Sequence, residues 1–111
     1  MPIRSKIRTG GALAFCLVLL ASPSLGAGPR VHRIGIDNLA FGPAPAGLHV
    51  NDIVEWTNSD ILEHTATATD GSFDVDLPAG ATGQTILKRA GSVSYVCRFH
   101  PGMKGRLEVA P

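Results

Sequence analysis

The feature that most constrains the fold of this chain is a series of short runs rich in Val, Ile and Thr. Gly, Pro, Asn and Asp separate the runs, and no amphipathic helical period appears beyond the N-terminal segment. The strands expected from these runs are residues 31–37, 47–50, 52–58, 64–69, 84–88, 93–97 and 105–110. Short strands with turn signals between them are typical of two packed sheets. The sequence therefore predicts an all-β sandwich of antiparallel sheets.

The alternation of side chains indicates which faces of two strands are buried. Val54 and Trp56 share one face of their strand, because successive strand residues point to opposite sides. Val93, Tyr95 and Cys97 likewise share a face near the C-terminus. Cys97 is therefore expected to point inward at the end of a core-facing row.

The N-terminal segment has the pattern of a secretory signal peptide, over residues 1–26. Three basic residues precede the apolar run 11–21, and the small-residue stretch 22–26 follows it. We expect cleavage between Gly26 and Gly28 and a single folded domain over 30–111. Two alternatives remain: an uncleaved membrane anchor, and a lipid attached to Cys16. The expected location is periplasmic or secreted, with no membrane span in the mature form.

The charge of the mature chain argues against nucleic-acid binding. After residue 26 the chain keeps seven Lys and Arg residues against nine Asp and Glu residues, a formal net charge of −2 with His neutral. Aromatic content is 5%, so the chain offers neither a basic surface nor many stacking platforms. Cys97 is the one cysteine beyond residue 26, and a free thiol in an exported protein calls for an explanation.

Metal ligation is an explanation that the neighbouring residues support. Cys97, His100 and Met103 are spaced three residues apart in one short loop, and His64 lies upstream, after the strand expected at 52–58. Two His, one Cys and a weak axial Met form the ligand set of a blue copper electron-transfer site. The sequence therefore predicts one copper ion, cycling between Cu(II) and Cu(I), bound by His64, Cys97, His100 and Met103.

Each ligand also has an ordinary explanation when it is taken alone. Cys97 fits an inert buried thiol, His100 a surface residue, and Met103 a filler of core gaps. Structural zinc uses Cys and His but not Met. A Cys–His nucleophile pair lacks any recognisable orienting group. His32 and His49 match no ligand spacing, and we expect both at the surface.

The chain resembles the cupredoxins, the blue copper proteins, and most closely the amicyanin-like and plastocyanin-like members. The segments that carry the resemblance are 38–43, 50–60, 64–65, 78–80, 91–97, 100–101, 103 and 105. The Cys-x-x-His-x-x-Met spacing is the short, amicyanin type of ligand loop. The resemblance implies a Greek-key β-sandwich of about seven to eight strands, one mononuclear copper, and single-electron transfer between transient redox protein partners outside the cytoplasm.

Three residues depart from the amicyanin-like pattern. Phe99 stands where Pro usually separates Cys from His, and Gly102 replaces a bulky residue before Met. Thr65 replaces the Asn that usually follows the first His and ties the two ligand loops together. We expect the Thr65 hydroxyl to supply part of that tie.

The function expected from these observations is electron carriage by a monomer that is not an enzyme. One alternative is a periplasmic copper-binding or copper-handling protein without an electron-shuttle role. A second is a metal-free sandwich that acts as an interaction module.

Overall fold

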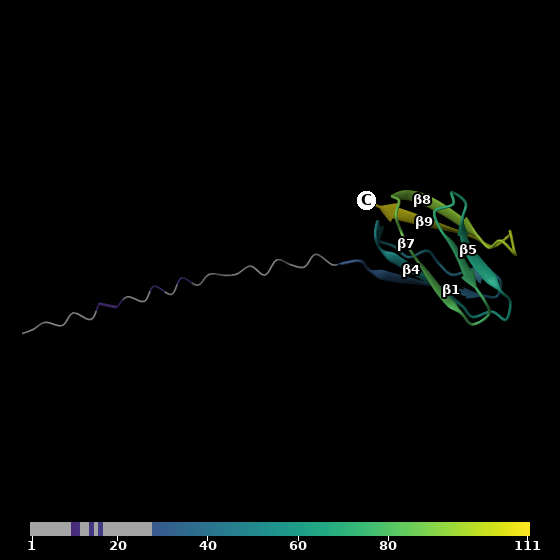
Figure 1. Cartoon of the computed structure of the whole chain (residues 1–111), viewed down its shortest axis with the longest axis horizontal. Coiled ribbons are helices and arrows are strands. Elements are labelled where there is room, and N and C mark those ends of the chain that lie inside the picture. Colours follow the sequence, from purple (N-terminus) through teal and green to yellow (C-terminus); the bar gives the residue numbers. More distant parts are fainter. Residues whose placement is uncertain (1–9, 12–13, 15, 17–27) are drawn as a thin grey trace, which may run out of the picture.

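The described part of the chain folds into two β-sheets that pack against each other (Figure 1). The structure is a computed structural model that describes residues 10, 11, 14, 16 and 28–111. The signal peptide expected at 1–26 falls almost entirely outside these residues and stays a prediction. Among the described residues, no helix has the length and hydrophobicity needed to cross a membrane.

The first sheet has the strand order β2-β1-β4-β7. Its strands are β1 (Val31–Asp37), β2 (Ala40–Phe41), β4 (Ile53–Asn58) and β7 (Thr82–Ile86). β1 and β4 run parallel, whereas the sequence predicted antiparallel sheets. The reason is the connection between them: after β2 the chain crosses to the other sheet, forms β3 (Leu48–His49), and returns to the end where β1 began.

The second sheet has the strand order β3-β9-β8-β5-β6. Its other strands are β5 (His64–Ala68), β6 (Asp74–Leu77), β8 (Gly91–Val96) and β9 (Lys104–Ala110). β3 pairs with β9 in parallel, and the remaining pairs are antiparallel. These crossings between the two sheets give the expected sandwich, with nine strands in the described residues instead of seven to eight.

The two additional strands, β2 and β6, are short and weakly marked in the sequence. β2 has two residues, too few to show any alternation. In β6, Asp74 and Asp76 are exposed while Leu77 is buried, so the alternation is real. Asp is rare in strands, which made the segment look like a loop. The strand expected at 84–88 lies instead at Thr82–Ile86, because β4 pairs with residues from Thr82 onward.

The core lies between the sheets and confirms the predicted faces. Val54, Trp56, Val93, Tyr95 and Cys97 are all buried, with Cys97 fully inaccessible. The rings of Trp56 and Tyr95, which come from opposite sheets, lie 5.5 Å apart between centroids in an edge-to-face arrangement. Aromatic pairs in this geometry add to the stability gained from burial.

Antiparallel pairing brings the start of β5 beside the end of β8. Thr67 pairs with Val96 and Ala68 pairs with Tyr95. His64, the first residue of β5, and Cys97, the residue after β8, therefore meet at the same end of the sandwich. The loop that joins β8 to β9 lies at that end, away from the C-terminus in Figure 1.

Candidate metal centre

The loop that follows β8 is closed by its own backbone. The N–H of Cys97 donates to the carbonyl of Met103 over 3.2 Å, and the N–H of Met103 donates to the carbonyl of His100 over 2.8 Å. Val96 pairs with Lys104 at the base of the loop. Residues 97–103 are thereby folded into a tight turn that returns directly into β9.

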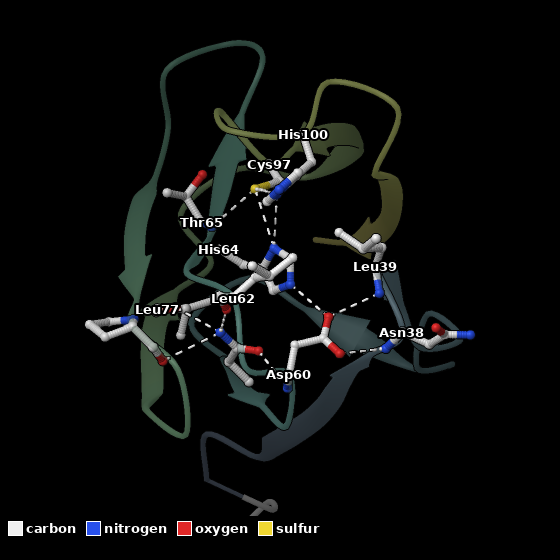
Figure 2. Close-up of polar contacts among 11 residues, drawn as sticks. Asn38, Leu39, Asp60, Leu62, His64, Thr65, Leu77, Cys97 and His100 are labelled. Atoms are coloured by element: carbon white, nitrogen blue, oxygen red, sulfur yellow. Dashed lines mark hydrogen bonds and ion pairs between the residues drawn. The ribbon is translucent and has the colours of Figure 1, made fainter.

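Three of the four predicted ligands bring donor atoms together at this loop. The Cys97 Sγ lies 3.7 Å from Nδ1 of His64 and 3.6 Å from Nδ1 of His100, and the two Nδ1 atoms are 3.2 Å apart (Figure 2). A point equidistant from all three atoms would lie about 2 Å from each, close to the metal–nitrogen distances found in proteins. The donor set and its spacing fit a single metal ion.

Met103 lies at the far end of the same loop and is buried, with 4% of its surface exposed. Its backbone contacts both His100 and Cys97, as described above. These contacts place the residue next to the three donors. His100 is half-buried, and its neighbours Phe99 and Pro101 are exposed.

The surroundings of Cys97 favour the thiolate, the form that binds metals. Burial raises the pKa of the thiol, but the N–H groups of Thr65 and Phe99 and the contacts with the rings of His100 and His64 outweigh burial and bring the pKa to about 6. The Thr65 N–H lies 3.4 Å from Sγ. Cys97 is thus prepared to bind a cation while it remains inaccessible to solvent.

Thr65 ties the two ligand-bearing segments together, as the sequence predicted. Its hydroxyl oxygen accepts the N–H of Arg98 over 2.9 Å, and its own N–H points to Cys97. Thr65 is fully buried. One residue of β5 therefore contacts two successive residues of the β8–β9 loop.

A carboxylate that was not singled out in the sequence holds the far nitrogen of His64. Asp60 Oδ2 lies 2.7 Å from Nε2 of His64, whose side chain is fully buried. The N–H groups of Asn38 and Leu39 also donate to this carboxylate, over 2.6 and 2.9 Å (Figure 2). These bonds lower the pKa of Asp60, with Leu39 contributing most and His64 next. For His64, burial lowers the pKa, but the contacts with Asp60 and Cys97 reverse this and raise it.

Asn58 anchors the loop that carries Asp60. Its fully buried side chain donates through Nδ2 to the carbonyls of Leu62 and Leu77, over 2.8 and 2.9 Å. Its Oδ1 accepts the N–H of Asp60 over 2.9 Å. The segment Asn58-Ser59-Asp60 reads as a turn in the sequence, and this is why its structural role was missed.

His32 and His49 lie away from the metal centre. His49 is exposed, as expected. The expectation that His32 is a surface residue was wrong: its side chain is 13% exposed, and its Nε2 lies 2.9 Å from Oδ2 of Asp52. Asp52 also accepts the N–H groups of Arg30 and His49. The buried carboxylate thereby joins β1 to the β3–β4 turn and holds His32 inward.

Comparisons with known proteins identify the fold. No protein-family profile matches the chain, and no curated protein matches its sequence. Solved structures of amicyanin do match. The crystal structure of amicyanin from Paracoccus versutus has a TM-score of 0.61 and 21% identity, covering 71% of this chain and 80% of that protein.

Two amicyanin mutants match similarly. A reduced mutant with phenylalanine in place of a proline has a TM-score of 0.56 and 25% identity, covering 74% of this chain and 82% of the mutant. The reduced Cu(I) form, at pH 4, of a mutant with glycine in place of a proline has a TM-score of 0.58 and 22% identity, covering 78% and 86%. With the sheet order and the ligand loop described above, these similarities show that the chain has the amicyanin-like cupredoxin fold.

Proposed function

We propose that this chain is an exported, mononuclear blue copper protein that carries single electrons between redox protein partners. The observation that carries the proposal is the convergence of Cys97 Sγ with Nδ1 of His64 and of His100. Two imidazoles and a thiolate in a plane, with a weak thioether, are typical of blue copper sites and serve both copper states. Bound copper would supply the one-electron redox couple.

In this proposal each ligand has a separate role. Cys97 is the principal ligand and the electronic connection to the protein, because a low pKa makes its thiolate available. His64 and His100 would supply the two imidazole ligands, and Met103 would supply the weak thioether that tunes the reduction potential. The chain is not proposed to be an enzyme, since the ligand set leaves no open position for a substrate.

The surroundings of the site hold the ligands in place. Cys97 and His64 are fully buried and lie within a bonded frame of Thr65, Asp60 and the loop backbone. A frame that does not move between oxidation states keeps the reorganisation that accompanies electron transfer small. This rigidity favours a carrier over a protein that releases copper, which is the alternative expected from the sequence.

Exposed apolar side chains near the ligands offer a surface for transient docking. Ile61 is 93% exposed, Phe99 50%, Leu39 46% and Leu62 45%. Ile61 and Leu62 precede His64, Phe99 precedes His100, and Leu39 belongs to the turn that contacts Asp60. Contiguous apolar surface marks interaction sites, and we propose that these four side chains contribute to one beside the ligands. Phe41, by contrast, packs inward on Tyr95 at 4.6 Å between centroids.

Addition of Cu(II) to the copper-free protein tests the proposed function. We expect an intense thiolate-to-copper charge-transfer band, a narrow-hyperfine EPR spectrum, and fast electron self-exchange. A blue protein with slow self-exchange and ready copper release would favour the copper-handling alternative. A chain that stays colourless with Cu(II) would contradict both and favour a metal-free interaction module. The signal peptide, the periplasmic or secreted location and the monomeric state belong to the same proposal.

A further inference from the structure

We propose that Asp60 is a positioning residue that fixes the proton of His64 on Nε2 and so presents an unprotonated Nδ1 to the metal. The inference rests on the proposed function, because it concerns which nitrogen of His64 faces copper. A neutral imidazole has one protonated nitrogen and one with a free lone pair, and only the second can bind a metal. The partner of the distal nitrogen therefore decides whether the metal-facing nitrogen is available.

The distal nitrogen of His64 contacts a group whose hydrogen-bonding role is fixed. Asp60 Oδ2 lies 2.7 Å from Nε2 of His64, and an ionised carboxylate can only accept hydrogen bonds. The proton of the neutral ring must therefore stand on Nε2. The lone pair of Nδ1 then points toward Cys97 and His100, 3.7 and 3.2 Å away. Because the ring is fully buried, the carboxylate is its partner in place of water.

Asp60 is itself fixed from two other segments. The β1–β2 turn donates the N–H groups of Asn38 and Leu39 to the carboxylate (Figure 2). The Oδ1 atom of Asn58 accepts the N–H of Asp60. Asn38 and Leu39 have φ values of 52° and 59°, in the left-handed region. That conformation is uncommon for Leu, because its Cβ comes too close to the following carbonyl oxygen. Two successive left-handed residues aim neighbouring N–H groups at one anion.

The strained turn is thus explained by what it binds. The turn holds the carboxylate, the carboxylate holds the imidazole, and the imidazole faces the metal. A carboxylate on the distal nitrogen also makes the ring a stronger donor, which favours Cu(II) over Cu(I). Asp60 is expected both to preorganise the copper-free site and to lower the reduction potential of the loaded one.

The direct test is the tautomer of His64 in the copper-free protein. Long-range ¹H–¹⁵N NMR, at a pH where the ring is neutral, distinguishes Nε2–H from Nδ1–H. We expect Nε2–H in the wild-type protein. In Asp60→Ala and Asp60→Asn the fixed preference should be lost, and a mixture of tautomers or the Nδ1–H form should appear. Glu63→Gln is the matched control, because it removes one negative charge beside His64 without touching the ring contact.

The copper-loaded proteins provide a second measurement. Asp60→Ala should bind copper about 10- to 100-fold more weakly, the usual cost of removing such a partner. Its reduction potential should rise, and by more than that of Glu63→Gln. A purely structural role for Asp60 would lower stability without changing the tautomer.

Two outcomes overturn the inference. One is a wild-type His64 with its proton on Nδ1, which decides the question even if the variants do not fold. The other is a folded Asp60→Ala that keeps the Nε2–H tautomer and shifts the potential no more than Glu63→Gln. The tautomer is measured without copper, so a wild-type protein that fails to turn blue would refute the proposed function separately.

Discussion

Replacement of Thr65 by Val tests whether the two ligand-bearing segments depend on one hydroxyl group. The hydroxyl oxygen accepts the Arg98 N–H over 2.9 Å and lies 2.9 Å from the hydroxyl of Thr67. Val has nearly the same shape as Thr but can make neither bond. The backbone N–H of Thr65 still points to Cys97 in the variant, so the thiolate keeps that contact.

The expected loss in the free energy of unfolding follows from the hydrogen-bond donor that Val leaves without an acceptor. Thr65 is fully buried, so Val removes an acceptor from the Arg98 N–H in a site that water does not replace easily. An unsatisfied buried donor costs about 1–3 kcal/mol. For a domain of this size, each kcal/mol lowers the melting temperature by roughly 4–8 °C. The Thr65→Val protein should therefore unfold at a clearly lower temperature and denaturant concentration than the wild-type protein.

The assay is urea and thermal unfolding of the copper-free proteins, with Thr82→Val as the matched control. Thr82 makes an exposed hydroxyl contact with Thr57 at 3.1 Å on the other sheet. Loss of such a surface contact should change the free energy of unfolding by less than about 0.5 kcal/mol. If Thr65→Val is no less stable than Thr82→Val, the hydroxyl tie does not hold the ligand loop in place.

The remaining predictions concern the ligands and acid stability. Cys97→Ser should abolish the charge-transfer band of the Cu(II) protein, measured by absorption, and a variant that stays deep blue would disprove the assignment. Met103→Leu should cost less than about 1.5 kcal/mol of stability but raise the reduction potential measured by voltammetry; an unchanged potential would mean that Met103 only fills the core. Hydrogen bonds from the Arg30 N–H and from His32 lower the pKa of Asp52 to about 2 from its ordinary value of 3.8. A carboxylate with a lowered pKa stabilises the fold above its ordinary pKa, and that stability is lost as the pH falls through the native value. Urea unfolding should thus show stability falling between about pH 4 and pH 2, less steeply in Asp52→Asn, and equal slopes would contradict this role.

The proposed metal ligands could be singled out in the sequence because their pattern is local. Cys97, His100 and Met103 lie within one loop, so their spacing is visible without any knowledge of the fold. The inward direction of Cys97 followed from the alternation in its strand, and its complete burial confirms it. Only His64 comes from elsewhere in the sequence, after the strand expected at 52–58, and the pairing of β5 with β8 brings it to the loop.

Asp60 could not be predicted because its role depends on three segments that meet only in the folded chain. It lies four residues before His64 in a segment that reads as an ordinary turn. Its other partners, Asn38 and Leu39, lie 22 and 21 residues away in sequence. The partial burial of His32 was missed for the same reason, since Asp52, its partner, lies in the β3–β4 turn, 20 residues away in sequence.

The strand features that the sequence did not predict depend on contacts with distant residues more than on the strand preference of the local residues. Asp74 and Asp76 in β6 are unfavourable in a strand by composition. In the folded protein, however, Arg98 reaches across to both carboxylates, at 3.2 and 2.7 Å. The parallel pairing of β1 with β4 depends on the path of the intervening chain, which no local pattern specifies.

The position of β9 inside its sheet determines when the ligand set can assemble. β9 is the last strand of the chain, yet it lies between β3 and β8 and forms the exit from the ligand loop. In a chain still emerging from the ribosome, His64 has been made long before Lys104–Ala110. Until those residues insert, nothing closes the loop that carries Cys97, His100 and Met103. The proposed ligand set is thus incomplete until the last strand of the chain has been made, and a metal held by all four residues would be captured after synthesis.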